Sequence, residues 1–132
     1  MSIDLKGTGV ALVTPFTKNN EVDYTALEKL VKHVIDGGVN YLVVLGTTGE
    51  SVTLSKDEKK KVVAKVIAVN AGKLPVVLGL GGNNTNELLQ ELENTDFTGI
   101  DALLSVSPAY NRPSQEGIYQ HYAALAKKSP LP

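Results

Sequence analysis

The sequence predicts an α/β fold in which four βα units build a parallel sheet, and two observations support this prediction. Short apolar, β-rich runs alternate with longer segments whose apolar residues recur at helical spacing. This alternation is typical of parallel strands joined by right-handed crossovers. The chain has 132 residues, close to half of the roughly 250 that a (β/α)8 barrel takes. Two architectures therefore remain open, a small doubly wound sheet and the first half of a (β/α)8 barrel.

The first two units each combine an apolar run with a capped helix. A strand is predicted at residues 10–13, and the helix that follows it has Asp23 as its expected N-cap. The second strand, residues 41–45, is apolar throughout, as a strand buried on both faces should be. The next helix opens with Ser55 and Glu58, which have the spacing of a capping box.

The third and fourth units repeat this order. Strands are predicted at residues 76–78 and 102–106. Asn84 or Thr85 is expected to cap the third helix, and Ser114 the fourth. The inward residues expected on the fourth helix are Ile118, Tyr122, Leu125 and Ala126.

The composition is that of an ordinary globular domain, with 42% hydrophobic and 20% charged residues. The net charge of −1 gives no electrostatic reason to expect nucleic acid or an anionic membrane as a partner. No apolar run approaches the roughly 18 residues of a membrane span, and no signal peptide is visible. The chain has no cysteine, which excludes disulfides and thiolate metal sites. We expect a cytoplasmic domain without metal or cofactor.

The residues after the second strand are the main candidates for chemistry, because functional residues of parallel α/β folds gather at the C-terminal ends of strands. The run is Gly46-Thr47-Thr48-Gly49-Glu50-Ser51. Its glycines let the backbone turn tightly and approach a ligand, and its threonines offer hydroxyl and N–H groups. The combination suits a small carboxylate or a proton relay. An ordinary βα turn, in which the threonines only cap, is the alternative.

Other candidates are weaker when taken alone. Tyr110 follows the fourth strand, where a tyrosine can act as general acid or base or can simply pack half-buried. The run Gly79-Leu80-Gly81-Gly82 fits a dinucleotide-binding loop poorly. His33 and His121 lie in helical segments without metal-ligand spacing, so we expect surface or packing roles. No lysine lies in a predicted strand, where burial would prepare it for Schiff-base chemistry.

Three motifs at the strand ends resemble the dihydrodipicolinate synthase and N-acetylneuraminate lyase superfamily. They are Thr14-Pro15-Phe16, the run from Gly46 to Ser51, and the run from Ser107 to Gly117, which resembles the synthase branch in particular. The similarity extends from about Gly9 to the last residue. It implies a (β/α)8 barrel of which residues 1–132 are the N-terminal half of a single domain, in an enzyme that is usually a homotetramer of two tight dimers.

The resemblance also implies a reaction. These lyases condense pyruvate with aspartate semialdehyde to 4-hydroxy-tetrahydrodipicolinate, through a Schiff base on a lysine of the sixth strand. By motif position, Thr48 would hold the pyruvate carboxylate, with Gly46 and Gly49 beside it in the binding turn. Thr47 would pass protons between two tyrosines. Tyr110 would be the tyrosine that reaches across the tight dimer interface into the partner's site.

Several features of the family are missing from this sequence. The Schiff-base lysine, the second relay tyrosine and the arginine for the semialdehyde carboxylate follow the fourth strand in the family, so we expect this chain to be inactive alone. Members inhibited by lysine carry a tyrosine and histidines where this chain has Ala109, Lys56 and Lys59. Two added cations would repel the ammonium groups of a bound lysine. We therefore expect poor inhibition by lysine. The effector positions that remain compatible are Ser51, Asn83 and Glu87.

Two alternatives stay open. One is another pyruvate-dependent aldolase of the same superfamily, a sialate or keto-deoxy-sugar acid lyase, which the run Asn111-Arg112-Pro113 disfavours. The other is a non-catalytic half-barrel that serves as an assembly module. Four βα units leave two open sheet edges, and open edges invite pairing with another chain. We expect these 132 residues to self-associate on that ground.

Overall fold

A computed structural model describes residues 3–132 of the protein and contains one sheet of four strands in the order β1-β2-β3-β4. All neighbouring strands are parallel. The strands are β1 (Gly9–Ala11), β2 (Tyr41–Val44), β3 (Val76–Gly79) and β4 (Ala102–Leu104). The helices are α1 (Tyr24–Asp36), α2 (Lys56–Asn70), α3 (Thr85–Asn94) and α4 (Gln115–Lys128), and two short 3-10 turns, η1 (Thr47–Gly49) and η2 (Ser51–Thr53), precede α2. The four predicted βα units are confirmed.

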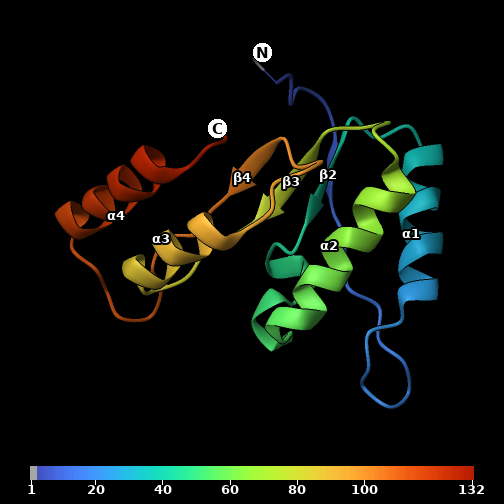
Figure 1. Ribbon diagram of the computed structural model, residues 1–132, viewed down its shortest axis with the longest axis horizontal. Helices are drawn as coiled ribbons and strands as arrows, with labels where there is room; N and C mark the ends of the chain where they lie inside the picture. The colour runs from blue at the N-terminus through green and yellow to red at the C-terminus, as the bar shows by residue number, and fades with distance from the viewer. Residues whose placement is uncertain (1–2) are drawn as a thin grey trace.

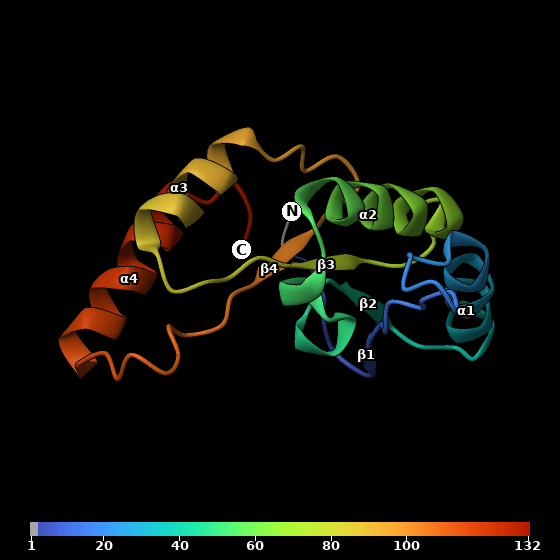
Figure 2. The same cartoon turned by 90° about the horizontal axis from the view of Figure 1, so that it is seen from below.

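The helices pack in two pairs, α1 with α2 and α3 with α4 (Figure 1), and the perpendicular view in Figure 2 shows the same pairs. Glu28 on α1 bonds to Lys32 on the same helix at 2.7 Å and to Lys65 on α2 at 3.2 Å. Glu93 on α3 pairs with Lys128 on α4. Such exposed ion pairs contribute little energy, so apolar packing must hold each pair together.

One face of the sheet and the helices enclose the core. The strand register aligns Val10, Leu42 and Val76, so these side chains point to the same face, and Leu42 and Val76 are fully buried. Burial of this apolar surface is the dominant stabilising term for the fold. The helical residues buried in the same cluster are Leu27, Val31, Val62, Val66, Leu88, Leu92 and Leu125.

The opposite face of the sheet is only partly covered within residues 3–132. Tyr41 and Val43 are half-buried there, and Val13 and Leu104 are 48% and 52% exposed. The expectation that the second strand is buried on both faces is therefore wrong for this chain, since its residues alternate between half-buried and buried. The described residues supply no second layer against this face, which explains the exposure.

The helix starts follow the predicted caps. Ser55 and Glu58 make both hydrogen bonds of the capping box. Of the two candidates for α3, Asn84 is the residue whose side chain accepts from the first turn. Asp23 and Ser114 cap α1 and α4 as predicted. Because a cap satisfies N–H groups that have no partner inside the helix, each helix begins at a defined residue.

The strands are shorter than predicted at the two edges of the sheet. β1 ends at Ala11 and not at residue 13, and β4 ends at Leu104 and not at residue 106. An edge strand has a partner on one side only, so its ends are less well fixed. On the outer side of β4, the N–H of Leu103 donates to the carbonyl of Pro132 at 2.8 Å. The last residue of the chain thus lies beside β4, where a next strand would pair.

The inner side of α4 differs from the prediction at one position. Leu125 is buried and Ile118 and Tyr122 are half-buried, as expected, but Ala126 is exposed. His121 is buried in its place, at 3% exposure. The inward residues of α4 therefore have the predicted 3–4 spacing but include a histidine. A prediction from apolar residues alone misses this position.

Candidate functional site

The run from Gly46 to Glu50 forms a tight turn directly after β2. Residues Thr47–Gly49 are the 3-10 turn η1. Two hydrogen bonds close it, from the N–H of Gly49 to the carbonyl of Gly46 and from the N–H of Glu50 to the carbonyl of Thr47, both at 3.0 Å. Thr47 and Thr48 are exposed, whereas Gly49 is buried. The two threonines predicted to carry chemistry therefore lie together at the surface, at the C-terminal end of a strand.

The turn leaves its polar groups available to a ligand. Within residues 3–132, no hydrogen bond occupies the N–H groups or hydroxyls of Thr47 and Thr48. Successive N–H groups that point outward make a concavity suited to an anion. Each hydroxyl can donate one hydrogen bond and accept others. This arrangement can bind a small carboxylate and can also pass a proton.

The residues on both sides of the turn have unusual backbone conformations. Leu45 and Glu50 have φ of 57° and 54°, in the left-handed region. Leu45 is 5% exposed, so it adopts this conformation inside the core. A large residue in this region is strained, and such strain persists only where the surrounding structure holds it. The turn is thus flanked by two fixed bends.

Thr14, in the segment that follows β1, contacts the turn. Its side chain is 5% exposed, and its hydroxyl donates to the carbonyl of Gly49 at 2.7 Å. The sequence singled out Thr14 as part of a motif but assigned no role to it. A buried hydroxyl without a hydrogen-bond partner is costly. That cost is the reason to look for a partner of Thr14 and so for a role in the turn.

Tyr110 lies at the surface of the chain. It follows β4, has φ of 67° and is 97% exposed. No hydrogen bond joins it to Thr47 in the described part of the chain. The structure therefore brings Thr47 and Thr48 together but leaves Tyr110 in solvent, where its hydroxyl is accessible to another surface.

The expected effector positions follow the C-terminal ends of β2, β3 and β4, and the turn likewise follows the C-terminal end of β2. Asn83 accepts a hydrogen bond from the N–H of Ala109 at 2.9 Å, so two of these positions meet directly. The others lie in η2, in the first two turns of α2 and in the first turn of α3. They are Ser51, Lys56, Lys59 and Glu87.

The buried polar group of the α3–α4 pair is structural. The Nδ1 atom of His121 lies 2.8 Å from the hydroxyl of Thr85, and its Nε2 atom is buried without a partner in the described residues. Tyr122 contacts Ser107 at 3.0 Å and the carbonyl of Ser105 at 3.1 Å. These bonds tie α4 to α3 and to the segment after β4. His33, by contrast, is exposed.

The lysines and acids of the described residues form no second reactive centre. Every lysine lies on a helix or in a loop and none is buried. Across residues 3–132 there is no group of three His, Asp or Glu side chains that could hold a metal ion. None of the helices in that range is both long enough and apolar enough to cross a membrane.

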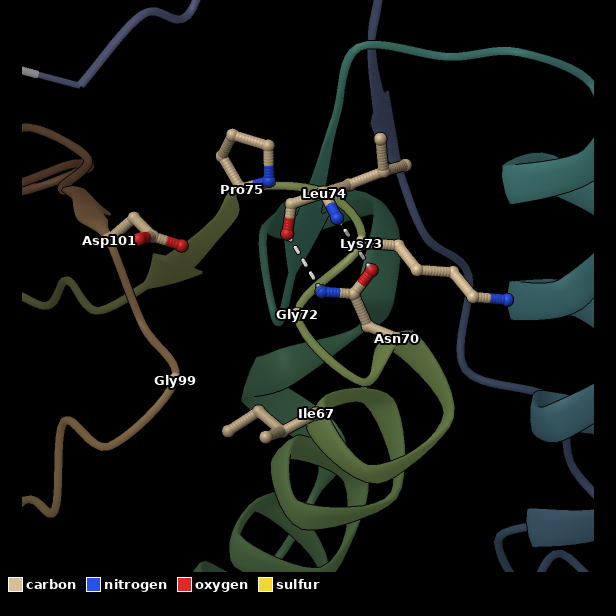
Figure 3. A pocket seen from close by; sticks show the side chains of 8 residues that line it. All are labelled: Ile67, Asn70, Gly72, Lys73, Leu74, Pro75, Gly99 and Asp101. Carbon is tan, nitrogen blue, oxygen red and sulfur yellow. Dashed lines mark hydrogen bonds between the residues drawn. The ribbon is translucent and has the colours of Figure 1, made fainter.

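A cavity of about 310 Å³ lies at the opposite end of the sheet from Thr47. Figure 3 shows its lining, which comes from the last turn of α2, the segment between α2 and β3 and the segment before β4. The Asn70 amide bonds to the carbonyl and N–H of Leu74, at 2.7 and 3.1 Å. Asp101 accepts from the N–H of Val76 at 2.9 Å. These polar groups hold the strand starts in place, and the cavity is separate from the candidate turn.

Comparison with known proteins supports one family. The model of the dihydrodipicolinate synthetase family matches residues 4–132. The 4-hydroxy-tetrahydrodipicolinate synthase of Flavobacterium psychrophilum is 60% identical over 126 residues, which are 96% of this chain and 43% of that protein. The synthase of Cytophaga hutchinsonii is 54% identical over 96% of this chain and 42% of its own length. The chain spans less than half the length of these curated relatives.

Solved structures of the same family share the fold. The chloride-inhibited dihydrodipicolinate synthase of Acinetobacter baumannii, solved with pyruvate, has a TM-score of 0.92 and 43% identity, over 98% of this chain and 44% of that one. A monomeric dihydrodipicolinate synthase variant has a TM-score of 0.88 and 44% identity, over 95% of this chain and 41% of that one. These relatives are (β/α)8 barrels, so the predicted half-barrel is confirmed. The chain belongs to the dihydrodipicolinate synthetase family.

Proposed function

We propose that residues 1–132 form the N-terminal half of the single barrel domain of a pyruvate-dependent lyase. The parent enzyme condenses pyruvate with aspartate semialdehyde to 4-hydroxy-tetrahydrodipicolinate, in the cytoplasm. The main support is the exposed turn Thr47–Gly49 at the end of β2, in a chain 60% identical to a protein named for this product.

The turn has the groups that pyruvate needs. The hydroxyl and N–H of Thr48 bind the pyruvate carboxylate, and the extended backbone of Gly46 and the bend at Gly49 shape the pocket for it. Hydrogen bonds from N–H and O–H donors to a carboxylate are stronger than those between neutral groups. Thr47 relays protons, since a hydroxyl can accept and donate at the same time. The exposure of both threonines supports these roles.

Tyr110 supplies the tyrosine of the relay to a neighbouring subunit. Its 97% exposure, and the absence of a hydrogen bond between it and Thr47 within residues 3–132, support an action outside its own chain. A homotetramer built of two tight dimers would meet this requirement, and one relative is a monomeric variant. If Tyr110 acts in the site of a neighbouring subunit, the parent enzyme must be an oligomer, so its oligomeric state tests this part of the mechanism.

The nucleophile comes from outside residues 1–132. In the proposed step, a lysine amine adds to the ketone carbon of pyruvate and the ketone oxygen leaves as water. Loss of a methyl proton gives an enamine, whose carbon attacks the aldehyde carbon of aspartate semialdehyde. Such a lysine must be uncharged to react, which burial favours. The lysines of this chain are exposed or half-buried on helices and loops, so they do not meet this condition.

Borohydride trapping with pyruvate, measured by intact mass, tests this proposal. The chain is compared with a chimeric enzyme, in which residues 1–132 are fused to the part of the Flavobacterium psychrophilum synthase that this chain does not match. We expect a trapped adduct on the chimeric enzyme and none on the chain alone. Trapping on the chain alone would contradict the position of the lysine. A folded chimeric enzyme that traps nothing would contradict the reaction.

A second candidate function has one observation in its favour. The half-covered sheet face, with Val13 and Leu104 exposed, and the outer edge of β1 could serve a non-catalytic assembly module. The absence of trapping in a folded chimeric enzyme favours that module. A sialate or keto-deoxy-sugar acid lyase is distinguished by a rate assay on the untreated chimeric enzyme, because such an enzyme would trap pyruvate with borohydride but would not consume aspartate semialdehyde.

A further inference from the structure

The geometry points to Thr14 and Gly79 as positioning residues that hold the Thr47–Gly49 turn from two sides. Neither residue lies in the turn itself. Thr14 follows β1 and Gly79 ends β3, and β1 and β3 are the two neighbours of β2 in the sheet. The segments at the ends of these two strands therefore fix the position of the turn that follows β2. The effect on substrate binding rests on the proposed function, whereas the effect on the turn's shape does not.

Thr14 holds the C-terminal end of the turn. Its buried hydroxyl donates to the carbonyl of Gly49 at 2.7 Å, across 35 residues of sequence. Gly49 itself is pressed against the end of β1, because a Cβ built on it would lie 3.1 Å from the carbonyl oxygen of Leu12. Loss of the hydroxyl would leave a buried carbonyl without its partner, which costs about 1–3 kcal/mol in general. The turn would have to shift to satisfy that carbonyl.

Gly79 holds the N-terminal end of the turn. A Cβ built on Gly79 would lie 2.5 Å from the carbonyl carbon of Leu45 and 2.6 Å from the nitrogen of Gly46. Real Cβ atoms do not approach backbone this closely, so the Leu45–Gly46 peptide occupies the space that any larger residue needs. This peptide follows the strained Leu45, whose φ is 57°. The missing side chain at Gly79 therefore permits the bend that starts the turn.

Thr47 and Thr48 lie between these two anchors. Their N–H and hydroxyl groups make no hydrogen bond within residues 3–132, so the positions of these groups depend on the ends of the turn. A displacement of about 1 Å in a binding or catalytic group can cost on the order of 100-fold in rate. Thr14 and Gly79 contact the turn and affect the substrate only through it, so their role is positioning.

Steady-state kinetics of the chimeric enzyme test this inference. We expect Thr14→Val to raise the KM for pyruvate by about tenfold, the equivalent of one lost hydrogen bond, with the KM for aspartate semialdehyde within about twofold. Thr14→Ser keeps the hydroxyl and should restore the KM for pyruvate. Gly79→Ala should raise it at least as much as Thr14→Val. The matched control is Gly82→Ala, whose Cβ would meet only Leu88 at 3.7 and 3.9 Å, and it should behave as the wild type.

Amide hydrogen exchange on the 132-residue chain gives a readout that does not depend on activity. The N–H groups of Gly49 and Glu50 close the turn, so their exchange reports on its shape. We expect faster exchange at both amides in Thr14→Val, by about tenfold for a local loss near 1.4 kcal/mol, and wild-type exchange in Thr14→Ser. Unchanged exchange in Thr14→Val and Gly79→Ala would overturn the positioning role. Altered exchange in a protein that traps no pyruvate would overturn the proposed function and leave the positioning role standing.

Discussion

At the scale of single residues, substitutions of the two threonines of the turn should change different kinetic constants. In the chimeric enzyme, we expect Thr48→Val to raise the KM for pyruvate by roughly 10- to 100-fold, because a hydrogen bond to a charged group contributes about 1.5–3 kcal/mol. Thr47→Val should lower kcat by about 100-fold with a smaller change in KM, as expected for loss of a proton relay. Steady-state kinetics with the matched Thr→Ser variants separates the two. Equal effects of both valine variants on KM alone would contradict the relay.

The cations at the start of α2 lead to a prediction about regulation. Lys56 is the first residue of α2 and Lys59 lies one turn further. The start of α2 follows the C-terminal end of β2, and Asn83 and Ala109, which meet through a hydrogen bond, follow the C-terminal ends of β3 and β4. The charges of Lys56 and Lys59 oppose binding of a lysine zwitterion, whose side chain carries a further ammonium group. We therefore expect the chimeric enzyme to keep its activity at submillimolar lysine. Strong inhibition in that range, measured as initial rate against lysine concentration, would contradict the prediction.

Not every site residue could be predicted from the sequence. Thr47 and Thr48 were predicted because a Gly-Thr-Thr-Gly run after an apolar strand has a local chemical meaning. The role of Thr14 and the burial of His121 could not be predicted in that way. Both depend on contacts with residues far along the chain, Gly49 for Thr14 and Thr85 for His121. Only the three-dimensional packing brings those partners together.

At the scale of single elements, the start of α2 should depend on pH. Glu58 accepts from both the N–H and the hydroxyl of Ser55, at 2.8 and 2.7 Å, and these bonds hold the pKa of its carboxyl below the ordinary value. A lowered pKa in the folded state stabilises the fold above the unfolded pKa, about 4.3 for glutamate. That stabilisation is lost as the pH falls through the folded pKa.

The variant Glu58→Gln tests this dependence in the 132-residue chain. Urea denaturation followed by circular dichroism should show a wild-type advantage that is constant between about pH 7 and pH 5 and shrinks below about pH 4.3. The control is Glu91→Gln on α3, since the carboxylate of Glu91 accepts no hydrogen bond from residues 3–132. A difference between wild type and Glu58→Gln that does not change with pH would show that the carboxylate charge adds nothing to the cap.

Helix starts were predictable to within one residue, with only the cap of α3 left between Asn84 and Thr85, and strand ends were not, for a physical reason. A cap such as Ser55 is a local contact within one turn, so its signature is written in four consecutive residues. A strand ends where its partner ends. The stretch at residues 102–106 is apolar except for Ser105, yet β4 stops at Leu104, where the pairing with β3 stops at Gly79. The length of β4 thus depends on a neighbour that its own sequence does not contain.

At the scale of the whole molecule, four parallel strands in sequential order were predicted correctly, but the covering of the sheet was not. The parallel sheet follows from the alternation of strands and helices and from right-handed crossovers. The sequential order follows from the half-barrel that the family resemblance implies, because the alternation alone left a doubly wound sheet open. Burial of β2 on both faces requires a second layer, and residues 3–132 form one layer of helices against one sheet. Val13 and Leu104 are therefore half exposed although their sequence neighbourhoods are those of core strands.

The same half-covered face leads to a prediction about association. Exposed apolar surface on a sheet, next to an open strand edge, favours pairing with a second copy. We expect the 132-residue chain to elute from size-exclusion chromatography above its monomer mass of 14.0 kDa, with a share of the larger species that rises with concentration. A monomer that unfolds cooperatively at all concentrations would contradict this expectation.

The surface used for association can be identified with two charge variants. Leu104→Glu places a carboxylate on the sheet face, where Leu104 is 52% exposed, and it should shift the chain toward the monomer because burying an unpaired charge is costly. Val52→Glu is the matched control, since Val52 is 93% exposed on η2 and off the sheet. If Val52→Glu disperses the larger species and Leu104→Glu does not, the copies meet through the loops at the strand ends. In that case the open sheet face is not the cause of association, and the assembly would bring Tyr110 of one chain toward the turn of the next.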